Sequence, residues 1–158
     1  MSTIDKAIEL AAKAHAGVKD KQGQPYLLHT IRVMLGGEGE TAQIVAVLHD
    51  VSEDSDVSLD DIRAAGFSQA VLDALDLVTH RPSQTYSDYV VACKQNQDAR
   101  QVKIADLRDN SSLARLLLRP ERFQGDSARM HRYVLSHRFL TDELTEDEYR
   151  RLMVDFEQ

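Results

Sequence analysis

The chain has 158 residues, of which 42% are hydrophobic and 28% charged, with one cysteine and a formal net charge of −7. These values predict a single folded domain over residues 1–158 with a sizeable core, and they exclude an internal disulfide. The acidic balance argues against nucleic-acid binding. The lack of any apolar run of ~20 residues argues against a membrane span, and the charged N-terminus lacks a signal-peptide core, so we expect a cytoplasmic protein.

Apolar residues recur at helical spacing along most of the chain, and no alternating strand pattern is present. Ser2-Thr3-Ile4-Asp5 resembles a capping box that starts a helix ending near Gly17. A polar loop containing Gly23 and Pro25 precedes a short helix over 29–35, which Gly36-Gly37 stop. The other predicted helices cover 41–54, 58–66, 68–78, 86–95, 98–117, 127–140 and 145–156. The sequence therefore predicts an all-α fold of eight or nine helices.

One apolar run ends in an unusual group of polar residues. Ile44 to Leu48 are all apolar, and His49, Asp50, Glu53 and Asp54 follow within six positions. Burying carboxylates is costly unless they are paired or bind a metal. A divalent cation would offset the desolvation of several acids at once. The competing interpretation is a helix cap or a set of satisfied hydrogen bonds, which the dipeptide His49-Asp50 alone does not exclude.

Two further segments favour the metal interpretation. His29 follows the polar loop in PYLLH, and the segment KIADLRDN places Asp106 and Asn110 four residues apart on one helix face. Together with His49 and Asp50, His29 and Asp106 supply four nitrogen and oxygen ligands, a set suited to a borderline metal with a position open to water.

Residues 99–132 form a basic segment in an acidic chain, with 8 Lys/Arg against 4 Asp/Glu. This segment is either a wall that binds an anionic ligand or a solvated helix face with spare arginines. Charge alone favours neither interpretation.

The order His29, His49-Asp50, Asp106 resembles the H…HD…D signature of HD-domain metal-dependent phosphohydrolases. Within that class, three stretches are similar to motifs of the (p)ppGpp hydrolase domains of RelA/SpoT-type proteins, and the similarity runs from about residue 7 to 133. The stretches are residues 11–29 (AxxAHxGxxDKxGxPYxxH), VAVLHDVSEDSD and VKIADLRDN. The resemblance implies an all-α HD-domain helical bundle and a stand-alone small hydrolase.

The resemblance also implies roles for individual residues. One divalent metal, in this group usually manganese(II), would be held by His29, His49, Asp50 and Asp106. Glu53 and Asp54 match the acids that handle the attacking water and its proton. The residues implied to bind the nucleotide substrate are Lys19, Asn110, Arg129 and Tyr133.

The resemblance implies hydrolysis of the 3′-pyrophosphate of (p)ppGpp to GDP or GTP and pyrophosphate, without nucleic acid or membrane as a partner. Val18 stands where the family has an arginine on the base-recognition side. Thr30 and Ser55 replace a proline and a threonine without touching the ligand set. Two alternatives stay open: the same chemistry on NADPH or a nucleoside monophosphate, and a nucleotide sensor with little turnover. The oligomeric state also stays open.

Overall fold

The computed structural model describes residues 2–157, so Met1 and Gln158, the ends of the predicted domain, lie outside the described residues. Over 2–157 the chain contains helices and loops and no strand beyond one isolated bridge between Lys19 and Pro25. The all-α prediction is confirmed. The α-helices are α1 (Ile4–Ala14), α2 (Leu27–Leu35), α3 (Glu40–Leu48), α4 (Val51–Asp54), α5 (Leu59–Ala64), α6 (Gln69–Val78), α7 (Tyr86–Lys94), α8 (Gln97–Asn110), α9 (Phe123–Leu140) and α10 (Glu146–Met153). Two 3₁₀ turns, η1 (Pro120–Arg122) and η2 (Val154–Phe156), accompany them.

The helix α3 lies at the centre of the N-terminal part of the molecule. Its residues from Ile44 to Leu48 are all buried, and it packs against α1, α2, α6 and α8. A helix that is apolar on all sides has no face suited to water, so it takes the central place. The apolar run identified in the sequence is therefore the core of this part of the fold.

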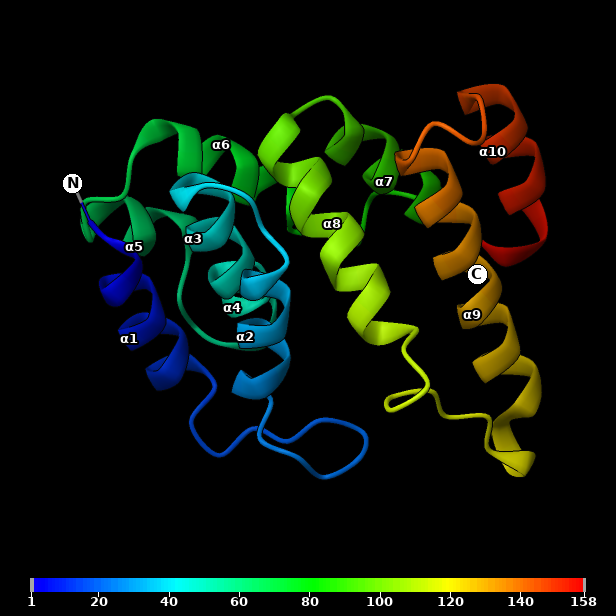
Figure 1. Cartoon of the computed structure of the whole chain (residues 1–158), viewed down its shortest axis with the longest axis horizontal. Helices are drawn as coiled ribbons and strands as arrows, with labels where there is room; N and C mark the ends of the chain where they lie inside the picture. Colours follow the sequence, from blue (N-terminus) through cyan, green and yellow to red (C-terminus); the bar gives the residue numbers. More distant parts are fainter. Residues whose placement is uncertain (1, 158) are drawn as a thin grey trace.

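The helix α8 joins the two parts of the molecule. In Figure 1 it runs between the α2–α3 group on one side and α9 on the other, and it contacts both. At Gly36, just past the end of α2, an added Cβ would lie 3.0 Å from the Cβ of Ala105 on α8. Glycine therefore permits the close approach that brings the side chains of α2 and α8 together.

Several predicted boundaries differ from the structure. The helix predicted over 41–54 is two helices, because the chain turns at His49 and Asp50 before α4 begins. The helix predicted over 98–117 ends at Asn110, and the one predicted to start at Ser127 starts at Phe123. The capping box predicted at Ser2 is wrong: Thr3 is the N-cap without a side-chain bond, and Ser2 Oγ donates instead to the Ala65 carbonyl.

The loops before α2 and after α8 lie at the same end of the molecule, at the lower edge of Figure 1. The Gln22 side-chain amide donates to the Arg115 carbonyl at 2.6 Å, which joins the two loops. Separately, none of the described helices, including the 18-residue α9, combines the length and apolar character needed to cross a bilayer.

Candidate active site

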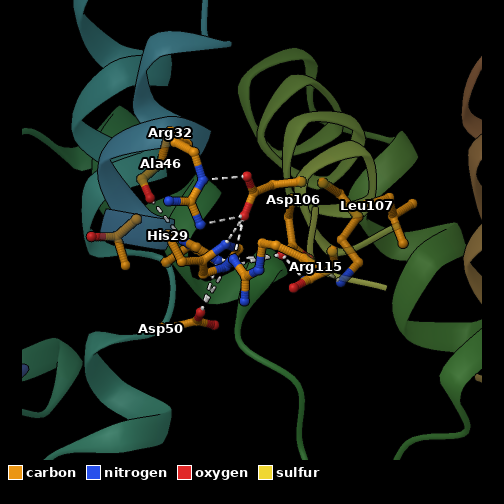
Figure 2. Close-up of polar contacts among 12 residues, drawn as sticks. His29, Arg32, Ala46, Asp50, Asp106, Leu107 and Arg115 are labelled. Atoms are coloured by element: carbon orange, nitrogen blue, oxygen red, sulfur yellow. Dashed lines mark hydrogen bonds and ion pairs between the residues drawn. The ribbon is translucent and has the colours of Figure 1, made fainter. Parts of the chain in front are cut away.

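Four polar side chains predicted as metal ligands meet between α2, the α3–α4 turn and α8. His29 comes from the first turn of α2, His49 and Asp50 from the turn, and Asp106 from α8. Asp50 Oδ2 lies 3.0 Å from His49 Nε2 and 3.6 Å from His29 Nε2. Asp106 Oδ1 lies 3.4 and 3.7 Å from the same two nitrogens. Figure 2 labels His29, Asp50 and Asp106 around this point.

Three of them, His29, His49 and Asp50, form a group whose donor atoms lie within 4.8 Å of one another and which could hold a metal ion. Both imidazole Nε2 atoms are buried and accept or donate no hydrogen bond. Each Nδ1 faces an acceptor that carries no proton, a carboxylate for His29 and the Ala46 carbonyl for His49. Each Nδ1 must therefore carry a hydrogen, so that in the neutral form of each ring the Nε2 lone pair is left for a ligand. The residues present fit a divalent cation.

The electrostatics of the cluster favour positive charge at this point. Burial alone would lower the pKa of His29, but Asp106, Asp109 and Asp50 outweigh it and raise the pKa to about 9. Burial also opposes the charged form of Asp50, yet the two histidines hold the pKa of its carboxyl well below the ordinary range. A cation that binds here would displace protons from the imidazoles, so its affinity would fall at low pH.

Three side chains that were not predicted from the sequence contact the proposed ligands, namely Tyr26, Lys103 and Asp109. The Tyr26 hydroxyl donates to Asp50 Oδ2 at 2.6 Å, and buried Lys103 donates to Asp106 Oδ2 at 2.9 Å. Lys103 Nζ also lies 4.9 Å from the ring centroid of Tyr89. Asn110, predicted to bind substrate, donates to Asp106 Oδ1 at 2.6 Å. A lysine inside the apolar segment VKIADL, three residues before an acid, was the signal that identifies Lys103.

Asp109 is the third of these unpredicted residues. Its Oδ2 accepts from His29 Nδ1 at 2.6 Å, and its two oxygens accept from Arg32 Nε at 2.6 Å and from Arg115. The same contacts lower its pKa, against the opposing effect of burial. The sequence signal was the spacing of three between Asp106 and Asp109, which places both acids near one side of α8.

The predicted catalytic acids follow the metal cluster along α4. Glu53 Oε1 accepts from the backbone N–H of His80 at 2.6 Å, and Asp54 lines a cavity beside the cluster. Both side chains are open to solvent, but their position over the buried cluster removes part of their hydration. This loss, together with the charge of Asp50, raises the pKa of each carboxyl.

The cavity beside the cluster has a volume of about 330 Å³ and brings together all four predicted substrate residues, Lys19, Asn110, Arg129 and Tyr133. Lys21, Arg115 and Val18 also line it, so its cationic side chains outnumber its acids, Asp20 and Asp54. A second hollow of about 490 Å³, between α2 and α8, contains none of the predicted residues.

A buried carboxylate on α9 fixes one wall of the cavity. Asp126 accepts from the backbone N–H, Nε and Nη2 of Arg119 at 3.0, 3.0 and 2.8 Å. It also accepts from Nη2 of Arg129 at 2.9 Å. Arg119 itself does not line the cavity. The Asp126 carboxylate therefore binds both Arg129, which lines the cavity, and Arg119, in the segment just before α9.

Comparisons with known proteins identify relatives of this chain and of its fold. No family model matches the sequence. A guanosine-3′,5′-bis(diphosphate) 3′-pyrophosphohydrolase of Aquifex aeolicus is 29% identical over 120 residues, which are 68% of this chain and 17% of that protein. A GTP pyrophosphokinase of Streptomyces antibioticus is 32% identical over 130 residues, 73% of this chain and 15% of that protein. The chain spans about a sixth of the length of these curated relatives.

A solved structure, described as "A metazoan ortholog of SpoT hydrolyzes ppGpp and plays a role in starvation responses", matches with a TM-score of 0.67 at 22% identity. The match covers 98% of this chain and 96% of that one, so the two share their fold over almost the whole length. The sequence matches and the shared fold show that this chain belongs among the relatives of the HD domains of RelA/SpoT-type proteins.

Proposed function

We propose that this chain is a metal-dependent phosphohydrolase whose substrate is a guanosine alarmone, cleaved at its 3′-pyrophosphate. Water would add across the bond between the 3′-oxygen and phosphorus, so that ppGpp gives GDP and pyrophosphate. The observation that carries the proposal is the pair of buried Nε2 atoms of His29 and His49, neither of which makes a hydrogen bond. They face the carboxylates of Asp50 and Asp106 beside a cationic cavity.

His29, His49, Asp50 and Asp106 would hold the cation, which we expect to be manganese(II). A bound divalent cation would lower the pKa of water and offset charge on phosphate oxygens. The fixed imidazole and carboxylate positions orient the reacting groups, because the cluster is buried and each Nδ1 is tied to an acceptor. Positioning and charge stabilisation are the main contributions in phosphoryl transfer.

Glu53 and Asp54 would move the protons. One Glu53 oxygen is engaged by the His80 N–H, which directs the side chain and leaves the other oxygen to accept a proton from water. Asp54 faces the cavity and has a raised pKa, so it suits the return of a proton to the leaving 3′-oxygen. Lys19, Arg115 and Arg129 would bind the phosphates, and Asn110 and Tyr133 the nucleoside.

Similarity to proteins named for guanosine bis(diphosphate) hydrolysis, and to a metazoan SpoT orthologue that hydrolyses ppGpp, supports the alarmone as substrate. Val18 favours a second candidate. It lines the cavity, and a valine side chain can neither stack on a base nor bind a phosphate as an arginine at the same position could, so we expect weaker selection for guanine. NADPH or a nucleoside monophosphate would then be accepted by the same chemistry, and we expect either activity in the cytoplasm.

Metal content is the first test. Purified protein, stripped with a chelator and reloaded with manganese, is expected to hold about one ion per chain. Elemental analysis measures this. Less than a tenth of an equivalent after reloading would contradict the proposal. His49→Ala is the matched variant, and its occupancy is expected to fall sharply because one of two nitrogen ligands is lost.

Substrate identity is the second test. Manganese-loaded protein is incubated with ppGpp, NADPH and nucleoside monophosphates, and products are separated by chromatography. GDP and pyrophosphate from ppGpp support the alarmone, whereas orthophosphate from the other nucleotides with ppGpp untouched transfers the function to the second candidate. Tight binding without turnover of any nucleotide would make the chain a sensor. Val18→Arg is expected to shift the ranking toward ppGpp.

A further inference from the structure

The carboxylate of Asp109 is the meeting point of three cationic or proton-donating side chains. His29 Nδ1 lies 2.6 Å from Oδ2, Arg32 Nε lies 2.6 Å from Oδ1, and Arg115 also contacts Oδ2. The Asp109 side chain is only 11% exposed, so these contacts replace most of its water. One carboxylate therefore links α2, α8 and the loop that follows α8.

We propose that Asp109 is a positioning residue that aims His29 Nε2 at the metal site, an inference that rests on the metal-dependent function proposed above. The imidazole can rotate about its Cβ–Cγ bond, and only one of the resulting orientations points Nε2 toward Asp50 and Asp106. A fixed acceptor at Nδ1 selects that orientation and the tautomer with a free Nε2 lone pair.

The other partners of the Asp109 carboxylate are two arginines. Arg115 contacts Oδ2, the oxygen that accepts from the imidazole, whereas Arg32 Nε donates to the other oxygen, Oδ1. Arg115 also lines the substrate cavity, and its Nη2 lies 3.9 Å from Oδ2 of Asp20, in the loop before α2. The residue that orients a metal ligand is thus tied to the wall of the cavity.

The second histidine of the cluster provides an internal comparison. His49 Nδ1 donates to the Ala46 backbone carbonyl at 2.7 Å, so a helix rather than an acid orients this ring. A carboxylate acceptor makes an imidazole a more basic ligand than a carbonyl does, and losing such a partner typically lowers metal affinity 10–100-fold. The effect of Asp109 on ring orientation and basicity is therefore confined to His29, and His49 serves as the comparison.

The simpler explanation is that Asp109 only joins Arg32 and Arg115, as a structural link between α2 and the loop. Removal of Arg32 weakens that link, whereas Arg115 still contacts Oδ2, the oxygen that accepts from His29, so we expect the contact between carboxylate and imidazole to persist. The Arg32 side chain is 42% exposed, and Arg32 is neither a proposed metal ligand nor a residue that lines the substrate cavity. Arg32→Gln is therefore the matched control that separates the two explanations.

Metal affinity is measured on the full chain by competition with a chelator, using zinc(II) as a diamagnetic probe. Asp109→Asn is expected to bind zinc 10–100-fold more weakly than the parent, and Asp109→Glu to recover part of the loss. Arg32→Gln is expected to stay within about threefold of the parent, as for a partly exposed ion pair. Parent affinity in Asp109→Asn, or an equal loss in Arg32→Gln, would overturn the proposal.

Nitrogen NMR of the zinc-loaded chain supplies a readout that a structural link does not affect. The Nδ1–H proton of His29 is expected downfield of that of His49, and Asp109→Asn is expected to move the His29 signals only. Coincident His29 and His49 protons in the parent overturn the inference even if Asp109→Asn does not fold. A parent that binds no zinc or manganese instead refutes the proposed function itself.

Discussion

The metal cluster and the substrate cavity are built in different ways although they share a boundary. The ligands lie on helices or on the tight turn between two of them, and three of the four are buried. The cavity is lined largely by the loops around 18–22 and 115–117, with α9 as its far wall. Helical packing fixes the geometry that the chemistry needs, whereas loops can change their side chains without disturbing it. Substitutions in the two regions should therefore have separable effects.

The largest effect is expected at the boundary between the regions. Glu53→Gln and Asp54→Asn keep the shape and hydrogen bonding of the acids but remove their ability to accept a proton. At least one is expected to lower turnover by ~10²–10⁴-fold, while metal and nucleotide binding change little. Single-turnover kinetics and binding calorimetry measure the two quantities. Parent turnover in both variants would mean that these acids are structural.

The next effect separates stability from chemistry inside the cluster. Lys103→Met removes the buried ammonium group that donates to Asp106 Oδ2 and is expected to lower the free energy of unfolding by about 3–5 kcal/mol in metal-free protein. The loss should be smaller after manganese loading, because a cation then offsets the charge of Asp106. Denaturant unfolding with and without manganese measures both values.

The control for this substitution removes both charges. Lys103→Met combined with Asp106→Asn should be more stable than Lys103→Met alone, since no uncompensated buried charge remains. A double variant that is less stable, by the sum of the two single losses, would show that the pairing of Lys103 with Asp106 contributes nothing.

A smaller effect is expected in the cavity. Arg129→Gln removes a charged donor and is expected to weaken nucleotide binding by about 1.5 kcal/mol, close to tenfold, without changing metal occupancy. Arg119→Gln is the matched control, because Arg119 binds the same Asp126 carboxylate but does not line the cavity. Equal weakening in both variants would indicate that the arginines act only through the fold.

The smallest effect concerns acid stability at the cavity wall. Contacts with Arg119 and Arg129 hold the pKa of Asp126 well below its ordinary value of 3.8. A carboxyl with a lowered pKa stabilises the fold above its unfolded pKa, and the contribution is lost as the pH falls toward the folded value. Asp126→Asn should therefore be less stable than the parent at neutral pH, with a gap that narrows below about pH 4.

Unfolding curves across this pH range measure the gap. Asp73→Asn, which removes an exposed acid on α6, is the control for a general loss of negative charge. A gap between Asp126→Asn and the parent that stays constant down to strongly acidic pH would show that Asp126 contributes no titrating charge to stability.

The helical fold was predictable from periodicity, because every helix packs an apolar face into the core. The ligand motif was predictable because each residue ends an apolar stretch or lies on its buried face, as His49 does after α3 and Asp106 does on α8. Lys103 and Asp109 were not predicted, because their roles depend on which side chains α2 and α8 bring together. The turn at Asp50 was also missed, since no glycine or proline marks it.

The turn between α3 and α4 separates two helices whose side chains point in independently set directions. Ile44 to Leu48 are set by the core around α3, whereas the direction of Glu53 and Asp54 depends on α4, which starts again after Asp50. Inserting or deleting one residue in α4 would rotate the two acids by about 100° around the helix axis without shifting a single core residue of α3. Changes in α4 can therefore redirect Glu53 and Asp54, the acids proposed to move protons, while His49 and Asp50, proposed to bind the cation, keep their positions.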